Sequence, residues 1–320
     1  MADLTVVVLD DAFASSVATS LDTLRTAAAL APRLGAPAPR WRVASPRGGA
    51  VRIGEGLTLD TVRLPRSGDS STWLVPGLGT ESPAAVLARL EQPDARAAVA
   101  GLRRHARAGG RVAASCSAVF LLAAAGLLEG RRATTTWWLA PVLADLAPGC
   151  TVDADRMVCA DGPVTTGGAA FAHTDLMLHL VRDHGGPALA DAVARTLVVD
   201  AREAQAPYVV PEVLANGDAL VLDLVTRIER ALPDPPSVTE LAAGLGISER
   251  TLSRHVHRAT GRTTFALVQS VKLRRARALL AGSTLSVDQV AAAVGYQDAT
   301  ALRRAMRKVT GATPSRYRGG

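Results

Sequence analysis

The stretch SVTELAAGLGI (residues 237–247) recurs later in the chain as SVDQVAAAVGY (residues 286–296). In both copies the apolar residues fall at helical spacing on one face. A glycine follows that face, Gly246 in the first copy and Gly295 in the second, and glycine permits a left-handed turn. Each copy therefore predicts a helix that ends in a tight turn.

A second helical segment follows each turn, with Ser248 or Asp298 placed to cap it. This is the helix-turn-helix arrangement, in which the second helix lies in the major groove of double-stranded DNA. Arginine suits that place because its guanidinium can bond both O6 and N7 of guanine, or lie on phosphates. The predicted DNA-contacting residues are Arg250, Ser253, Arg254 and His255 in the first copy and Thr300, Arg303, Arg304, Arg307 and Lys308 in the second.

With these motifs, roughly the last 85 residues resemble the AraC/XylS family of transcription regulators, most specifically in AAAVGYQDAT (residues 291–300) and GATPSRYR (residues 311–318). The resemblance implies an all-α domain with two helix-turn-helix units joined by a long helix, here residues 265–282. An all-helical interaction module is the alternative. The family usually has phenylalanine on the recognition helices at three positions that this chain fills with Val256, Leu302 and Met306.

Charge supports the same function independently. Residues 218–320 contain 16 Lys and Arg against 8 Asp and Glu, whereas the preceding 217 residues contain 20 against 21. The net charge of +7 therefore belongs to the C-terminal third. Positive charge concentrated in one domain is what contact with DNA phosphates requires.

At 320 residues the length indicates two domains, and a 48 % hydrophobic composition can fill both cores. The longest apolar stretch, residues 119–128, is too short to span a bilayer, and no basic start followed by an apolar run opens the chain. We therefore expect a cytoplasmic protein without membrane contact. The three cysteines, Cys116, Cys150 and Cys159, form no metal-spaced set, and we expect no metal or cofactor.

The first 200 residues alternate strand-like and helix-like segments. This alternation predicts an α/β domain with a parallel sheet covered on both faces, whose binding sites lie at the carboxyl ends of the strands. The expected strands are residues 4–10, 40–46, 71–77 and 110–116, and the expected helices are residues 15–30, 84–90 and 95–108.

One strand end carries a cysteine. RVAASCSAVFLLAAAGLL (residues 111–128) runs from an apolar strand through Cys116 directly into an apolar helix. The sulfur is thus expected at a sharp turn beside a helix N-terminus, where backbone N–H groups stabilise an anion. This geometry is a nucleophile elbow, although a lone cysteine is more often a small buried apolar residue.

Residues 4–200 resemble the class I glutamine-amidotransferase-like superfamily of PfpI type, on LVPGLG (residues 74–79), the Cys116 turn, AGLLEGRRATTTWW (residues 125–138) and VTTGGAAFAHTDLMLHLV (residues 164–181). The resemblance implies a flavodoxin-like sandwich in which a glycine loop, here residues 77–79, faces the cysteine and can hold a ligand oxygen. The candidate ligand-binding residues are Ser16, Gly77, Gly79, Cys116, Ser117, Thr135, Thr136 and Trp137.

Catalysis by this superfamily needs partners that the chain lacks. Cysteine hydrolases often have a histidine directly after the cysteine, where this chain has Ser117, and related regulators have one where Thr136 stands. Ser16 stands near the place of an acidic partner. His105 is expected on a solvated helix face among arginines, and His173 lies near the start of a helix. The sequence therefore predicts a pocket without catalytic machinery.

The expected organisation is a sensor domain at residues 1–200, a linker at residues 201–217 and a DNA-binding domain at residues 218–320. The corresponding function is a transcription regulator that responds to a small molecule near Cys116 and forms a homodimer through the sensor domain. Three alternatives for the first domain remain: a cysteine-dependent amidase or hydrolase, a thiol redox sensor based on Cys116, and a dimerisation scaffold with a filled pocket.

Overall fold

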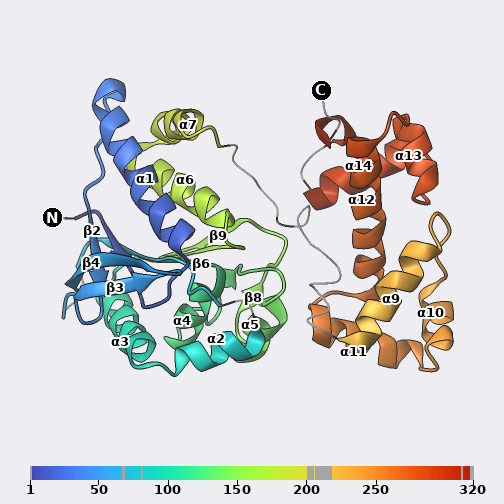
Figure 1. Cartoon of the computed structure of the whole chain (residues 1–320), viewed down its shortest axis with the longest axis horizontal. Coiled ribbons are helices and arrows are strands. Elements are labelled where there is room, and N and C mark those ends of the chain that lie inside the picture. The colour runs from blue at the N-terminus through green and yellow to red at the C-terminus, as the bar shows by residue number, and fades with distance from the viewer. Residues whose placement is uncertain are drawn as a thin grey trace. The chain divides into compact units, whose positions relative to one another are not determined.

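The computed structural model of the chain describes residues 2–66, 69–80, 82–199, 205, 218–310 and 313–317. The chain divides into two compact units, residues 1–203 and 204–320 (Figure 1). Except for Gln205, the expected linker lies outside the described residues, so its boundaries stay a prediction. No helix among the described residues is long and apolar enough to cross a membrane.

The first unit contains an eight-stranded sheet with the order β3-β4-β2-β1-β5-β6-β10-β9. The six strands from β4 to β10 run parallel, and the edge strands β3 and β9 pair antiparallel with their neighbours. The four predicted strands are confirmed as β1 (Leu4–Val7), β2 (Trp41–Ser45), β5 (Thr72–Val75) and β6 (Val112–Ser115). The others are β3 (Gly49–Ile53), β4 (Leu57–Arg63), β9 (Val158–Asp161) and β10 (Val164–Gly167), with a separate pair β7 (Arg132–Ala133) and β8 (Thr151–Val152).

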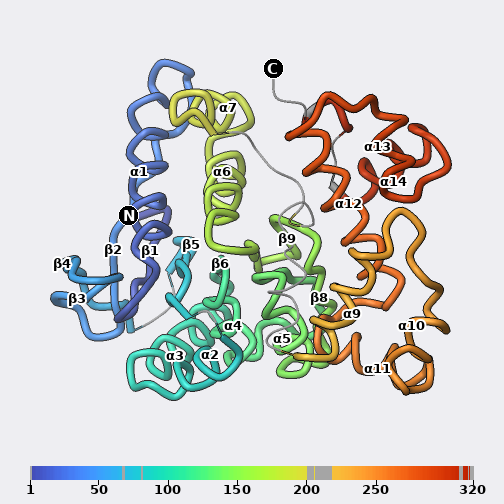
Figure 2. The backbone as a smooth tube through the Cα atoms, turned by 45° about the vertical axis from the view of Figure 1, so that its right-hand side comes forward, coloured from blue at the N-terminus to red at the C-terminus, as the bar shows by residue number. Residues whose placement is uncertain are grey.

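Helices cover both faces of this sheet (Figures 1 and 2). One layer is α1 (Ala14–Leu30), α6 (Ala172–Gly185) and α7 (Pro187–Thr196), continued by the 3-10 turn η1 (Ala31–Leu34). The other layer is α2 (Pro83–Leu90), α3 (Pro93–Arg107), α4 (Val119–Ala124) and α5 (Ala140–Leu146). Separate apolar clusters fill the space on the two faces of the sheet, as expected for a parallel sheet buried on both sides. The predicted fold class of this unit is thereby confirmed.

The expectation for His105 was wrong. Its side chain is fully buried, and its ring stacks on Trp73 with centroids 4.3 Å apart. Nε2 lies 3.1 Å from the carbonyl oxygen of Arg111, to which it donates, and burial lowers the pKa of the imidazole. The arginines beside it in sequence are exposed, but Ala98, Leu102 and His105 share the helical face that packs on the sheet.

The second unit is all helical and confirms the duplicated arrangement. Its helices are α9 (Ala219–Arg230), α10 (Val238–Gly244), α11 (Glu249–Thr260), α12 (Thr264–Gly282), α13 (Val287–Ala293) and α14 (Ala299–Thr310), followed by η4 (Pro314–Tyr317). The helix pairs α10–α11 and α13–α14 are the two helix-turn-helix units, and α12 runs between them (Figure 2).

Local signals in the sequence explain these helices. Ser248 Oγ accepts a hydrogen bond from the N–H of Thr251 at 3.1 Å, and Asp298 Oδ1 accepts one from the N–H of Ala301 at 2.7 Å, so both predicted caps are confirmed. The two turn glycines have φ of 70° and 77°. The side chains at the three positions that depart from the family's phenylalanine, Val256, Leu302 and Met306, are fully buried.

Candidate functional sites

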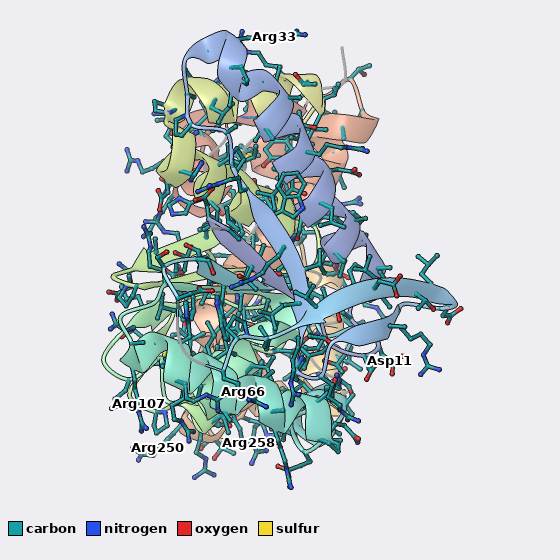
Figure 3. All side chains as sticks on the ribbon, turned by 90° about the vertical axis from the view of Figure 1, so that its left-hand side faces the viewer. Asp11, Arg33, Arg66, Arg107, Arg250 and Arg258 are labelled. Atoms are coloured by element: carbon teal, nitrogen blue, oxygen red, sulfur yellow. The ribbon has the colours of Figure 1, made fainter. Side chains whose placement is uncertain are left out.

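The recognition helix of the first helix-turn-helix, α11, presents a basic face to solvent. Arg250 and Arg254 are exposed as the sequence predicts, and Ser253 is half-buried beside them. His257 and Arg258 are also exposed and extend the same face, because they lie three and four residues after Arg254. The sequence analysis missed these two, although helical spacing could have found them. Figure 3 shows the Arg250 and Arg258 side chains projecting away from the ribbon.

His255 is half-buried and bonded to the start of another helix of the same domain. Its Nε2 lies 2.7 Å from Oδ2 of Asp218, and the two side chains are each 25 % exposed. The other carboxylate oxygen of Asp218 caps α9 by accepting the N–H groups of Leu220 and Val221. His255 thus connects the recognition helix to the first turn of α9.

The second recognition helix, α14, offers a denser basic surface. Thr300, Arg303, Arg304, Arg307 and Lys308 are all exposed and together line an open hollow of about 500 Å³. In the part of the chain that the structure describes, neither these cations nor Arg250 and Arg254 form an ion pair. Unpaired guanidinium groups on the second helix of a helix-turn-helix are free to contact phosphates and guanine edges.

The first unit contains the expected elbow at Cys116, where β6 passes through the 3-10 turn η2 (Cys116–Ala118) into α4. Cys116 has a φ of 56°, a left-handed conformation that a non-glycine residue rarely adopts, and it is 8 % exposed. Its N–H donates to the carbonyl of Gly168 at 2.8 Å, and Thr135 Oγ1 donates to its carbonyl at 2.8 Å. Two hydrogen bonds and burial therefore hold the strained turn.

The glycine loop lies against this elbow. A Cβ added at Gly77 would lie 3.2 Å from the Cβ of Cys116, so a side chain there would crowd the cysteine. Gly79 has a φ of 68°, and a Cβ there would overlap the carbonyl oxygen of Asp11. The N–H of Leu78 donates to Ser117 Oγ at 3.1 Å. That amide is already engaged, so it does not point to a substrate oxygen as an oxyanion hole requires.

The remaining candidates, Ser16, Thr136 and Trp137, differ in their surroundings. Ser16 Oγ and Thr136 Oγ1 are buried and have no hydrogen-bond partner among the described residues. Thr136 follows Thr135, whose hydroxyl bonds to the Cys116 carbonyl. Trp137 is 5 % exposed and meets Trp138 edge to face, with ring centroids 4.8 Å apart.

Comparison with known proteins fits both units. Residues 241–320 match the model of a helix-turn-helix domain, and residues 79–183 match that of the DJ-1/PfpI family. The chain is 30 % identical over 311 residues to the HTH-type transcriptional regulator GlxA of Rhizobium meliloti, covering 95 % of this chain and 91 % of that one. The chain belongs to this family of AraC-type transcription regulators.

A second curated relative and a solved structure also resemble this regulator. It is 29 % identical over 294 residues to the HTH-type transcriptional regulator CdhR of Pseudomonas aeruginosa, covering 90 % of this chain and 84 % of the relative. A crystal structure of an AraC family transcriptional regulator from Pseudomonas putida superposes with a TM-score of 0.51 at 20 % identity, over 62 % of this chain and all of the other. That likeness concerns the fold. Both resemblances drawn from the sequence, to AraC-type regulators and to PfpI-type domains, are confirmed.

His173 of the regulator is buried in a network next to the elbow. Ser20 Oγ donates to the carbonyl of Ser16 at 2.9 Å, so it accepts from His173 Nε2, 2.7 Å away. Nδ1 then accepts from Ser115 Oγ at 2.8 Å. Burial lowers the pKa of His173 to about 3, which keeps the ring neutral. The histidine therefore supports the residue before Cys116.

Proposed function

We propose that this DNA-binding regulator responds to a small molecule bound beside Cys116 in a non-catalytic sensor domain, and that it acts as a cytoplasmic homodimer joined through that domain. The observation that carries the DNA-binding part is the set of unpaired cations on α11 and α14, held on two capped helix-turn-helix units. Two such helices, one in each unit, are suited to adjacent major grooves of one operator.

Substitution of two arginines, one on each recognition helix, tests sequence-specific DNA binding. Arg254→Ala and Arg304→Ala should each weaken binding of the full chain to the DNA upstream of its own gene, by about 1 to 3 kcal/mol per lost bidentate base contact. Arg230→Ala is the matched control, because Arg230 is an exposed arginine at the end of α9, outside the recognition helices. The assay is fluorescence anisotropy with random DNA as competitor and with salt varied.

The outcome separates two kinds of contact. Loss of a base contact weakens binding to the operator and leaves binding to random DNA unchanged. Loss of a phosphate contact weakens binding to both and lowers the slope of affinity against salt concentration. If both variants bound operator and random DNA as tightly as the Arg230→Ala control does, the proposed reading face would be wrong.

The absence of catalysis is proposed from the elbow itself. The Leu78 amide is engaged by Ser117 Oγ, and both ring nitrogens of the buried His173 are engaged by the hydroxyls of Ser20 and Ser115. A nucleophilic thiol needs a base within hydrogen-bond reach and donors for the developing oxyanion. Release of ammonia from carboxamide substrates by the wild type but not by Cys116→Ala would contradict this assignment.

The effector site is proposed from two buried hydroxyls, Ser16 Oγ and Thr136 Oγ1, that have no hydrogen-bond partner among the described residues. A buried hydroxyl without a partner costs free energy, which a ligand hydrogen bond would recover. Thr136→Val should therefore leave the free energy of unfolding unchanged or raise it, and should abolish the effector response.

The probe is the dialysable fraction of a cell extract, added to the operator-binding assay with the full chain. We expect it to change the affinity of the wild type and not that of Thr136→Val. Equal responses of the two proteins, or no response of the wild type, would refute the site near Cys116. Light scattering at high concentration tests the dimer, and a monodisperse monomer would count against it.

A further inference from the structure

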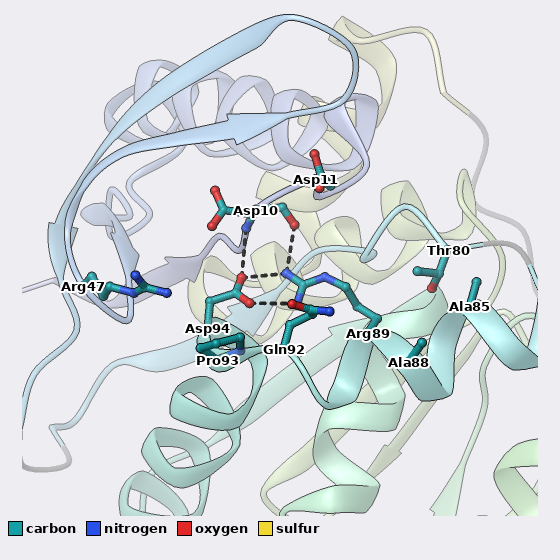
Figure 4. Close-up of a pocket in the computed structure, with 10 residues that line it drawn as sticks. All are labelled: Asp10, Asp11, Arg47, Thr80, Ala85, Ala88, Arg89, Gln92, Pro93 and Asp94. Atoms are coloured by element: carbon teal, nitrogen blue, oxygen red, sulfur yellow. Dashed lines mark hydrogen bonds and ion pairs between the residues drawn. The ribbon is translucent and has the colours of Figure 1, made fainter.

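A hollow of the sensor unit opens at the carboxyl end of β1, with a volume of about 490 Å³ (Figure 4). It lies where β1 has β2 on one side and β5 on the other, the topological switch point at which open α/β sheets bind ligands. A narrower hollow of about 120 Å³ adjoins it and shares Asp10, Arg47 and Asp94. The lining residues of the larger hollow are Asp10, Asp11, Arg47, Thr80, Ala85, Ala88, Arg89, Gln92, Pro93 and Asp94.

A buried ion pair forms the floor of this hollow. Arg89 and Asp94, whose side chains are 10 % and 11 % exposed, are joined by hydrogen bonds of 2.6 and 2.8 Å. Burial alone would raise the pKa of Asp94, but the hydrogen bonds and charge of Arg89, with two backbone N–H groups, hold it below its ordinary value. The carboxylate is therefore ionised at neutral pH.

This ion pair clamps the backbone of Asp10 on both sides. Asp94 Oδ2 accepts the N–H of Asp10 at 3.1 Å, and Arg89 donates to the carbonyl of Asp10 at 2.9 Å. A buried pair is an expensive way to gain stability, since desolvation opposes its attraction. Here it fixes the position of one residue at the mouth of the hollow, which is what a preorganised binding site requires.

Two charges in the hollow form no ion pair with a described residue. In the described part of the chain, the Asp10 carboxylate and the Arg47 guanidinium form no ion pair, whereas Asp11 pairs with Arg52 at 3.0 Å. Thr80 Oγ1 is buried and also lacks a hydrogen-bond partner among the described residues. Figure 4 shows Arg47 on one side and Thr80 on the other, with Asp10 and the Arg89–Asp94 pair between them.

We infer that this hollow binds a small zwitterion, with its cationic group on Asp10 and its carboxylate on Arg47. A ligand with only one sign of charge would satisfy one of these side chains and oppose the other, whereas an amino-acid-like molecule satisfies both. The volume is that of a small-molecule site, and Thr80 and Gln92 can bond polar atoms between the charged ends.

The test is isothermal titration calorimetry of the full chain without DNA, using the standard L-α-amino acids with their C-amidated and N-acetylated forms. We expect at least one free amino acid to bind and both modified forms of it to bind at least about tenfold more weakly. Asp10→Asn and Arg47→Gln should each cause a similar loss. The matched controls are Asp60→Asn and Arg33→Gln, exposed residues outside the hollow that form no ion pair with a described residue.

Three results would overturn the inference. They are no binding by any free amino acid, equal binding by the amidated and acetylated forms, and unchanged affinity in both hollow variants. If Cys116→Ser lost amino-acid binding while Asp10→Asn and Arg47→Gln kept wild-type affinity, the ligand would instead lie at the elbow. Because no DNA is present, failure here leaves the proposed function to its own assay.

Discussion

The two turn glycines occupy matching places in the repeat but have different surroundings. Gly246 has a φ of 70°, and a Cβ added there would meet nothing within 4 Å. Gly295 has a φ of 77°, and a Cβ there would overlap the carbonyl oxygen of Pro233 and lie 3.0 Å from Lys272 Nζ. Replacing each by alanine therefore separates the cost of the backbone conformation from the cost of the contact.

The expected magnitudes differ accordingly. Gly246→Ala should cost about 1 to 2 kcal/mol, the penalty for a side chain in the left-handed region. Gly295→Ala should cost this penalty and also displace the carbonyl oxygen of Pro233, which is a backbone atom and cannot move aside as the end of a flexible side chain could. That displacement threatens the 3.1 Å hydrogen bond from Lys272 Nζ to the Gly295 carbonyl, and bonds of charged groups contribute about 1.5 to 3 kcal/mol. We expect a total of about 3 kcal/mol or more.

Urea unfolding of the full chain measures this difference with two probes. All four tryptophans lie in the first unit, so their fluorescence reports that unit, whereas far-UV circular dichroism also reports the helices of the second. Gly295→Ala should shift the dichroism transition well below that of Gly246→Ala and leave the fluorescence midpoint unchanged. Equal shifts in the two variants would refute the role of the Pro233 contact.

Three further predictions concern polar contacts. Asp94→Asn should lower the free energy of unfolding, measured by tryptophan fluorescence, by about 3 kcal/mol, because it leaves Arg89 buried without its carboxylate. Since the folded pKa of Asp94 lies below 3.8, the extra stability of the wild type is present above pH 3.8 and is lost as the pH falls further. His173 has a pKa of about 3 in the folded protein against an ordinary 6.5, so on acidification the unfolded chain takes up the proton first. The free energy of unfolding of the wild type should therefore fall by about 1.4 kcal/mol per pH unit below pH 6.5. An equal slope in His173→Gln would contradict this. Asp218→Asn should weaken the bond to His255 and lower operator affinity without changing the tryptophan transition, and unaltered affinity would count against it.

The DNA-binding unit was predictable because its signals are local. The expected connecting helix at residues 265–282 is α12 (Thr264–Gly282), and α9 begins at its cap, Asp218. Capping boxes at Ser237 and Ser286 fix two further starts. In each case the residues that decide the structure stand within one helical turn of it, so a pattern along the chain records them.

The sensor unit was less predictable where its structure depends on distant residues. β10 and the β3–β4 hairpin were not assigned, since the sequence of β10, VTTG, has no continuous apolar run and β4 is largely exposed. His105 was placed on the wrong face, because its sequence neighbours are arginines and its partner Trp73 belongs to another element.

The hollow at β1 escaped sequence reasoning for the same reason. Asp10, Arg47 and Asp94 each resemble an ordinary surface charge in the sequence, and Asp94 reaches Asp10 across 84 positions. By contrast, the placement of Gly77 against Cys116 followed from the resemblance to PfpI-type domains, whose motifs preserve that loop and turn together.

Both reading units are tied to the ends of α9, the first described helix after the expected linker. At its start, Asp218 holds His255 of the first recognition helix; just beyond its end, Pro233 contacts Gly295 in the second turn. Between these points Arg227 donates to the carbonyl of Gly244 at 3.2 Å. These contacts join α9 and the residues that flank it to both helix-turn-helix units, so a substitution that displaces α9 should disturb both of them.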